Sequence, residues 1–323
     1  MTASRATRRV IFDHDGGIDD LLSLLLLLRM PDIELLGVTI TPADCYPDDA
    51  LISTLKILHL CGKSDIPVSV GNQVGPNPFP PDWRAQPRIC HSLPAILRVE
   101  EQSDNRVAMP AHLWIRETLE ACESHVTVLM TGPATNLMWA LEGHSGPGNN
   151  IEEVVWMGGA IDVKGNVAMH DHDGSAEWNA YWDPAATSWL VGSGLPLCLV
   201  PLDATNALPV DNGFLRTLAN RNTPVSDLAG QFWAATVTAI PTYEFTYFMW
   251  DILSTSILGL AESTYTRETG TLSVCTTTPQ AGRIFRDPAG SNVSWVTSVE
   301  AEEARSFVIR HLSGEFQVQA ANC

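Results

Sequence analysis

The chain of 323 residues has little positive charge: 19 lysine and arginine residues stand against 37 aspartate and glutamate residues, a formal net charge of −18. The phosphates of nucleic-acid polymers and the headgroups of anionic membranes repel so acidic a protein, so both are disfavoured as partners. The negative charge does not disfavour a neutral small molecule or a divalent cation as a partner. Charged residues are only 17% of the chain and hydrophobic residues 45%, which is typical of a globular protein and argues against disorder.

The chain also lacks paired cysteines and long hydrophobic runs. None of its seven cysteines belongs to a Cys-x-x-Cys pair, and this odd, scattered set predicts free thiols in a reducing compartment rather than a disulfide framework or a zinc site. No cleavable apolar segment follows the basic N-terminus. The apolar run 21–28 is too short to span a bilayer and predicts a buried helix. We therefore expect a soluble, cytoplasmic protein.

Strand-like and helix-like segments alternate along the chain. Strands are expected at 10–12, 33–40, 67–71, 126–130, 154–157 and 196–202. Helices are expected at 19–30, 47–61, 112–122, 133–141 and 184–191, and a long segment rich in proline and asparagine follows residue 71. A largely helical region (225–260), a hairpin-like region (271–299) and a helix (301–312) end the chain. The pattern predicts an α/β fold: a mostly parallel, Rossmann-like central sheet flanked by helices, plus a small C-terminal β-hairpin-like region.

The densest run of acid follows the first expected strand. Residues 13–20 read Asp-His-Asp-Gly-Gly-Ile-Asp-Asp, which is four carboxylates in eight residues. A single aspartate here would only cap a helix. Four of them repel one another, so the run favours a hard cation bound by oxygen ligands. The carboxyl ends of parallel strands gather at one edge of the sheet, so the loops after residues 40, 130, 157 and 202 are expected beside this run.

This octapeptide resembles the N-terminal signature of the nucleoside hydrolases, which cleave the N-glycosidic bond of ribonucleosides. Further segments resemble the same family in the same order over nearly the whole chain: 41–45, 77–84, 126–136, 157–167, 173–184 and 250–251. The resemblance implies a single nucleoside hydrolase-like catalytic domain over residues 1–323. It is closest to the purine-specific, inosine-adenosine-guanosine-preferring branch, which carries tryptophans at the positions of Trp83 and Trp250. The broad-specificity branch typically has histidine before the last metal aspartate.

The resemblance implies a calcium site and a ribose site. Calcium would bind the carboxylates of Asp15, Asp20 and Asp251 and the backbone carbonyl of Thr131. Asp15 would also be the general base for the calcium-bound water, and Asp13 would orient the loop. The implied substrate-binding residues are Asp19, Asp44, Asp82, Met157, Asn166, Glu177, Trp178 and Asn179. Of these, Met157 would line the 5′ side of the ribose and Asp44 would lie near the base. The partner is a small purine ribonucleoside, and a homodimer or homotetramer is expected.

The purine is a poor leaving group as an anion, and no histidine or glutamate of the matched segments is well placed to protonate it. Trp83 and Trp250 could sandwich the base and favour its protonated form through their negative ring faces, with solvent as the proton source. A tryptophan taken alone more often packs in the core. The place of Trp83 in a proline-rich loop, and of Trp250 beside a predicted ligand, favour the functional role for both.

Other functions remain as alternatives. A broad-specificity or pyrimidine-preferring nucleoside hydrolase would share the same calcium site. Asp13-x-Asp15-Gly16 also resembles the motif of the haloacid-dehalogenase-like phosphatases, although the later segments suit ribose recognition. A binding protein that has lost turnover is a third alternative. The alternating His170-Asp171-His172-Asp173 would suit a transition metal, but an exposed loop beside the pocket is the favoured interpretation.

Overall fold

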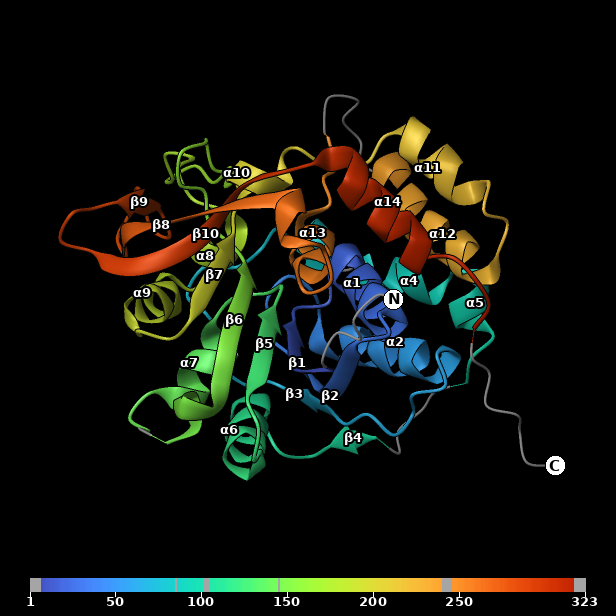
Figure 1. The fold of residues 1–323 in the computed structure, drawn as a ribbon, viewed down its shortest axis with the longest axis horizontal. Coiled ribbons are helices and arrows are strands. Elements are labelled where there is room, and N and C mark those ends of the chain that lie inside the picture. Colours follow the sequence, from blue (N-terminus) through green and yellow to red (C-terminus); the bar gives the residue numbers. More distant parts are fainter. Residues whose placement is uncertain (1–6, 85, 101–104, 145, 240–245, 317–323) are drawn as a thin grey trace.

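The computed structural model describes residues 7–84, 86–100, 105–144, 146–239 and 246–316 (Figure 1). Over these residues the strands form one ten-stranded sheet with the order β4-β3-β2-β1-β5-β6-β7-β10-β8-β9. The strands are β1 (Arg8–His14), β2 (Ile33–Ile40), β3 (Val68–Val70), β4 (Arg106–Val107), β5 (Val126–Met130), β6 (Ile151–Met157), β7 (Leu197–Val200), β8 (Tyr265–Val274), β9 (Ile284–Arg286) and β10 (Ser291–Val299).

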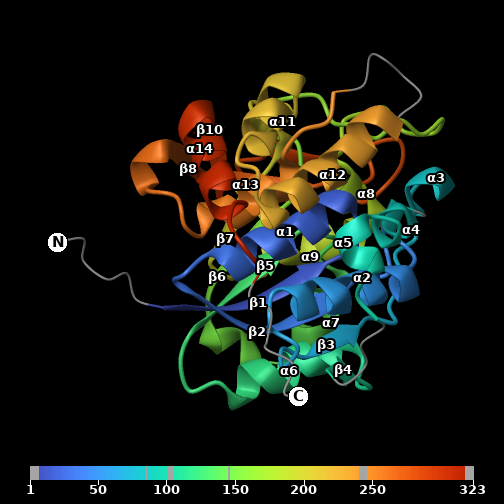
Figure 2. The ribbon, with the colours of Figure 1, turned by 90° about the vertical axis from the view of Figure 1, so that its right-hand side faces the viewer.

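Helices cover both faces of this sheet. They are α1 (Ile18–Arg29), α2 (Pro47–Leu60), α3 (Pro81–Arg84), α4 (Gln86–His91), α5 (Pro94–Leu97), α6 (Ala111–Ala121), α7 (Thr135–Leu141), α8 (Trp178–Trp182), α9 (Pro184–Gly192), α10 (Leu202–Thr205), α11 (Asn212–Ala219), α12 (Pro224–Ala239), α13 (Trp250–Ile257) and α14 (Ala301–His311), with short 3₁₀ turns at Pro147–Asn150 and Glu262–Thr264. Helices α1, α2 and α12 lie on one side of the sheet and α6 and α7 on the other (Figure 2).

Most neighbouring strands run parallel, as predicted. From β4 to β10 in the sheet order every pair of neighbouring strands is parallel. The pairs β10–β8 and β8–β9 are antiparallel. The C-terminal strands are hairpin-like, but they are not a separate unit. Because β10 pairs in parallel with β7, with Ser294 opposite Cys198, they extend the central sheet.

The sequence of β1 explains its place at the centre of the sheet. Val10 and Phe12 belong to the core beneath α1, whereas Ile11 belongs to the core on the opposite face. Successive side chains of a strand point to opposite faces, so a continuous apolar run requires a cover on both. All three side chains are fully buried between β2 and β5.

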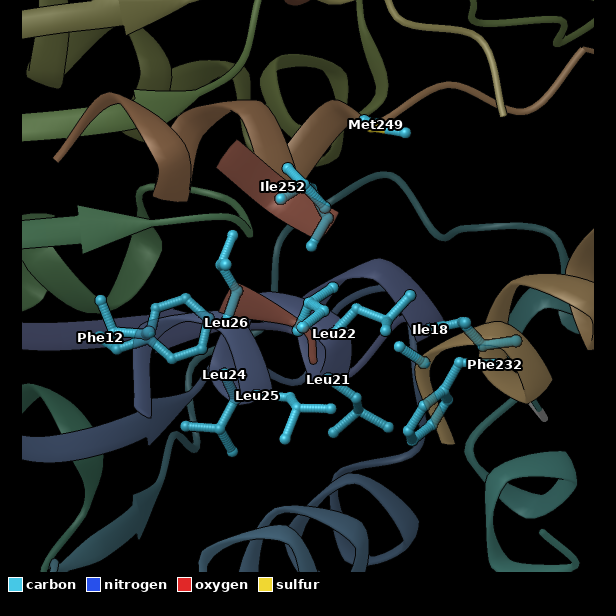
Figure 3. Close-up of a cluster of buried hydrophobic side chains, with 14 of the residues drawn as sticks. Phe12, Ile18, Leu21, Leu22, Leu24, Leu25, Leu26, Phe232, Met249 and Ile252 are labelled. Carbon is cyan, nitrogen blue, oxygen red and sulfur yellow. The ribbon is translucent and has the colours of Figure 1, made fainter. Parts of the chain in front are cut away.

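Helix α1 is buried on nearly every side. Its leucines pack against Phe12 of β1, Phe232 of α12 and Ile252 of α13 in one apolar cluster (Figure 3). The predicted buried helix at residues 21–28 is thereby confirmed, since a helix that is apolar all round needs neighbours all round. Among the described residues, no helix is both long and apolar enough to cross a membrane.

The segment rich in proline and asparagine contains three short helices, α3 to α5, that the sequence pattern did not predict. Pro94 is the first residue of α5, a position where the missing N–H of proline costs nothing. The segment is joined to the loop after β2, because the N–H of Tyr46 donates to the carbonyl of Arg84 (3.1 Å). This bond holds α3, with Trp83, next to the carboxyl end of the sheet.

Candidate active site

Carboxylates from separate segments of the chain meet beyond the carboxyl ends of β1 and β2. Asp19 and Asp20 lie in the first turn of α1, and Asp251 lies in the first turn of α13, which packs beside α1. One oxygen of each lies within 4.8 Å of the other two, the one such group among the described residues. A Cβ at Gly17 would lie 2.9 Å from Oδ2 of Asp20, 2.9 Å from Oδ2 of Asp44 and 3.1 Å from Oδ1 of Asp19. Any larger residue at position 17 would fill the space on which they converge.

Asp15 joins this group from the loop after β1. Its Oδ2 accepts a hydrogen bond from the backbone N–H of Asp44 (3.1 Å), and its carboxyl group is hydrogen-bonded to that of Asp20. A Cβ at Gly132 would lie 2.9 Å from the Cβ of Asp15, so glycine lets the turn after β5 come close. In the same turn, Thr131 donates its hydroxyl to Oδ1 of Asp20. The acid cluster is defined as Asp15, Asp19, Asp20, Asp44 and Asp251.

The acid cluster has no cationic partner at ion-pair distance. Within the described part of the chain, no lysine, arginine or histidine nitrogen lies within 4.0 Å of its carboxylates. Burial, followed by repulsion from neighbouring carboxylates, raises the pKa of Asp19 to about 7. The same causes raise the pKa values of Asp15, Asp44 and Asp251 well above their usual range. Without a bound metal ion, these carboxyl groups therefore tend to keep their protons, and a metal ion would replace them.

The donor set fits a hard divalent cation. It consists of carboxylate oxygens, which are the ligands that calcium and magnesium prefer, and the hydroxyl of Thr131 contacts one of them. Asp15, Asp20 and Asp251 are buried, whereas Asp19 and Asp44 are partly exposed. One oxygen of Asp44, Oδ1, is buried without a hydrogen-bond partner. The cluster thus combines the buried carboxylates of Asp15, Asp20 and Asp251 with two partly exposed carboxylates, those of Asp19 and Asp44, that a ligand can reach.

Asp13 lies beneath the acid cluster and orients the loops around it. Its Oδ1 accepts from Oγ1 of Thr39 (2.6 Å) and Nδ2 of Asn136 (2.9 Å), and its Oδ2 accepts from Oγ1 of Thr41 (3.1 Å). Burial raises its pKa to about 7. A phosphatase of the haloacid-dehalogenase type would need this first aspartate as an exposed nucleophile. Asp13 is fully buried and its oxygens accept hydrogen bonds from Thr39, Thr41 and Asn136, which does not suit that role.

The predicted ribose residues form a second group beside the acid cluster. Glu177 caps α8: its Oε1 accepts from the N–H of Asn179 (2.8 Å), and its Oε2 accepts from the N–H groups of Gly159 (3.0 Å) and Ala180 (3.2 Å). Nδ2 of Asn179 donates to the carbonyls of Thr131 (2.8 Å) and Met157 (3.1 Å). The ends of β5, β6 and α8 are thereby joined, although these residues lie far apart in the sequence.

Asn166 is tied to the same helix but is more exposed. Its Oδ1 accepts from the N–H of Trp178 (3.1 Å). Asp82 is in α3, and its side chain lies outside the described residues. The indole nitrogen of Trp178 is buried and has no hydrogen-bond partner, so Trp178 offers an unused donor at this place.

The two predicted base-stacking tryptophans reach the site from different elements. Trp83 of α3 packs edge-on against Trp178 of α8, with ring centroids 5.2 Å apart, in an aromatic group that includes Phe79. Trp250 begins α13 next to Asp251 and packs against Met157. Both indoles are only partly buried, unlike the core tryptophans. Each tryptophan therefore lies beside predicted site residues and keeps exposed surface.

Sequence reasoning missed Tyr247. Its side chain is buried, its hydroxyl is hydrogen-bonded to Asp19, and its ring meets Trp250 edge-on at 4.7 Å. Burial and the nearby aspartates raise its pKa well above the usual range, so it keeps its proton. Its closeness in the sequence to Trp250 and Asp251 was the available signal. The six residues before 246 lie outside the described part of the chain.

The loop at 170–173 does not suit a transition metal. The N–H of Gly174 donates to Nδ1 of His172 (3.0 Å), so the proton of the neutral ring is on Nε2, which donates to the carbonyl of Ala281 (2.9 Å). Asp173 is held by the N–H of Ser175 and by Nε2 of Gln280. Both nitrogens of His172 are used, and the loop instead ties the β6–α8 connection to the β8–β9 connection.

The fold is that of an α/β protein, and at the carboxyl edge of its sheet lies a carboxylate cluster that could hold a metal ion. Comparison with known proteins gives the family. The family model of the inosine-uridine preferring nucleoside hydrolases matches residues 10–306. The chain belongs to this family and is a nucleoside hydrolase.

Individual relatives agree on the family and differ in the base they prefer. The structure of an inosine-uridine preferring nucleoside hydrolase from Bacillus anthracis superposes with a TM-score of 0.88 and 35% identity, over 95% of this chain and 99% of that one. A purine-preferring ribonucleoside hydrolase from Gardnerella vaginalis has a TM-score of 0.80 at 21% identity, covering 97% of this chain and 100% of that one, and shows the fold alone. The pyrimidine-specific ribonucleoside hydrolases RihA of Photobacterium profundum and Shewanella baltica are 27% and 34% identical. They cover 70% and 62% of this chain, which spans 70% and 60% of their lengths.

Proposed function

We propose that this nucleoside hydrolase prefers purine ribonucleosides and uses calcium held by Asp15, Asp20, Asp251 and the carbonyl of Thr131. The observation that carries the metal proposal is the acid cluster: five buried or half-buried carboxylates, none of which has a cationic nitrogen of the described residues within 4.0 Å. Asp19 groups with Asp20 and Asp251 within 4.8 Å, so its carboxylate is near enough to bind either the ion or a ribose hydroxyl. Calcium, when bound, would offset part of the negative charge of the cluster and acidify a water molecule.

The residues of the chain supply the remaining chemistry. The Asp15 carboxylate, fixed at Oδ2 by the N–H of Asp44, takes the proton of the attacking water. Asp19, Glu177, Asn166 and Asn179 hold the ribose hydroxyls, and Met157 lines the 5′ side. Positive charge grows on the sugar as the glycosidic bond breaks, and the surrounding carboxylates stabilise it. Solvent protonates the leaving base.

Base preference rests on Trp83 and Trp250. A purine offers a larger π-face than a pyrimidine, so two partly exposed indoles beside the ribose residues favour it. A pyrimidine preference is the competing proposal, supported by the relatives from Photobacterium profundum and Shewanella baltica whose names are pyrimidine-specific. Cytoplasmic location and a homodimeric or homotetrameric state stay predictions.

A substrate panel separates these two preferences. The wild type should release ribose from inosine with a kcat/KM above that for uridine. Replacing either Trp83 or Trp250 by alanine should lower the inosine value roughly 5- to 150-fold, since base–aromatic stacking contributes about 1–3 kcal/mol per base. Trp139→Ala is the matched control, because Trp139 is 45% exposed on α7 and belongs to no predicted site. The stacking proposal would be refuted if uridine and inosine had equal kcat/KM values. It would also be refuted if neither Trp83→Ala nor Trp250→Ala changed the value for inosine.

Calcium binding should release protons. In the metal-free protein, burial and mutual repulsion keep protons on the acid cluster, with the pKa of Asp19 at about 7. A cation binds the deprotonated form, so its apparent affinity should fall as pH drops from 8 to 6, up to tenfold per pH unit for each proton released. Titration calorimetry in two buffers of different ionisation enthalpy measures the number of protons. An affinity that does not change over this pH range would contradict the expected linkage.

A further inference from the structure

A cavity of about 300 Å³, apart from the acid cluster, lies between the β6–α8 connection and the β8–β9 connection. Lys164 and Arg283 line it, together with Ser175, Gln280 and the carboxylate of Asp173. The two connections are joined here, because Nε2 of Gln280 donates to Oδ2 of Asp173 (2.8 Å) and the N–H of Asp173 donates to the carbonyl of Pro279 (2.9 Å). The cavity is thus built from two segments that hydrogen bonds hold together.

The nearby carboxylates already have partners. Asp162 and Glu268 share the guanidinium of Arg286, at distances down to 2.6 Å and 2.5 Å. Asp203 accepts from the backbone N–H groups of residues 161 and 162. Asp173 is engaged at both oxygens, by the N–H of Ser175 and by Gln280. These four carboxylates therefore do not depend on Lys164 or Arg283 for a partner.

Lys164 and Arg283, by contrast, have no ion pair. Neither lies within 4.0 Å of a carboxylate of the described residues, in a chain whose acids outnumber its lysines and arginines by 37 to 19. The stem of Lys164 lies over Gly174, where a Cβ would be 3.5 Å from its Cε. The backbone N–H of Arg283 donates to the carbonyl of Gln280 (2.9 Å), and its guanidinium lies 5.6 Å from the ring of Phe285. The backbone of Arg283 is thereby held in place.

Ser175 adds a third donor. Its Oγ is buried and has no hydrogen-bond partner, and the residue lines the cavity. A buried hydroxyl without a partner costs free energy, and a ligand oxygen would remove that cost. A guanidinium, an ammonium and a hydroxyl together offer the donors that phosphate oxygens accept. Asp173 opposes this charge, so the lining carries a formal net charge of +1.

We propose that this cavity binds a phosphate group through Lys164, Arg283 and the hydroxyl of Ser175. A volume of about 300 Å³ is at the lower end for small-molecule sites and exceeds what one phosphate ion fills, so it has room for the rest of a small phosphomonoester. The site is separate from the acid cluster. It is nevertheless close to the ribose residues in the chain, because Ser175 lies two residues before Glu177.

Titration calorimetry of the full calcium-loaded chain at constant ionic strength tests the proposal, with inorganic phosphate, glycerol 3-phosphate and glycerol as probes. Saturable one-to-one binding of at least one phosphate probe and none of glycerol is expected. Tighter binding of glycerol 3-phosphate identifies a phosphomonoester as the ligand class, and binding of inorganic phosphate that is equal or tighter identifies the free ion. Absence of saturable phosphate binding, or binding of glycerol, would overturn the proposal.

Variants connect the binding to this cavity. Lys164→Met and Arg283→Met should each weaken phosphate binding at least tenfold, and Arg283→Lys should recover part of it. Lys63→Met, an exposed lysine near the end of α2, is the matched control and should bind as the wild type does. Unchanged binding in both methionine variants would locate the anion elsewhere, for instance at the calcium, and would also overturn the proposal. Ribose release from inosine without phosphate should stay normal in all variants, which checks their folding independently of the anion.

Discussion

Asp15→Asn is expected to lower kcat for nucleoside hydrolysis about 10³-fold or more, because an amide cannot take the proton of the attacking water. The substitution keeps the size of the side chain and one side-chain oxygen, which can replace Oδ2 as the acceptor for the N–H of Asp44 or as a ligand of the cation. Calcium affinity should therefore fall less than turnover does. Ribose release measured with saturating inosine and calcium, together with calcium titration of the same variant, separates the two effects.

Two controls make this result specific. Asp32→Asn removes the same charge from an exposed turn and should leave turnover unchanged. Asp13→Asn removes a buried carboxylate that contacts Thr39, Thr41 and Asn136. Turnover should fall less in this variant than in Asp15→Asn, since Asp13 only orients the loop. If Asp15→Asn kept more than a tenth of wild-type turnover, Asp15 would not be the general base. Calcium-dependent binding of nucleosides without turnover in the wild type would instead favour the binding-protein alternative.

Removal of divalent cations is expected to abolish hydrolysis, and added calcium should restore it. Without a cation the acid cluster takes up protons, because burial raises the pKa values of Asp15 and Asp251 well above their usual range. A protonated Asp15 cannot act as a base, and no cation then holds the ribose hydroxyls. Magnesium should restore less activity, since it prefers near-octahedral geometry with several waters to a mostly protein ligand set. The measurement is ribose release after exhaustive chelation and readdition of single ions.

Thermal unfolding gives an independent reading of the same site. Binding to the folded state alone stabilises it by about 2.7 kcal/mol when calcium is at 100 times its Kd. The melting temperature should therefore rise with calcium in the wild type and much less in Asp251→Asn. Full activity after chelation, or a melting temperature that calcium does not move, would show that the acid cluster holds no ion.

Local sequence was sufficient for much of the fold. The residues 33–40 form β2 as predicted, and the apolar run 21–28 lies within the buried helix α1. Both depend on the pattern of near neighbours, which is present in the sequence itself. The short helices α3 to α5 were missed because their few residues carry no periodicity, and their place depends on bonds such as that of Tyr46 to Arg84.

The candidate site was predictable where its residues share a motif. The octapeptide at 13–20 contributes three of the five members of the acid cluster, and the resemblance to the family supplied the ribose residues. Tyr247 was missed because its bond to Asp19 joins residues more than 200 positions apart. His172 was considered as a metal ligand, but the N–H of Gly174 and the carbonyl of Ala281 occupy its ring.

An apolar strand followed by a run of aspartates is visible in the sequence, and it predicts a cation site at the edge of a sheet. Which other groups reach that edge depends on the tertiary fold. Asp251 arrives there because α13 packs against α1, and β10 joins the sheet because it pairs with β7. The reason is physical: periodicity is a property of neighbouring residues, whereas contacts across the chain depend on how buried faces fit together.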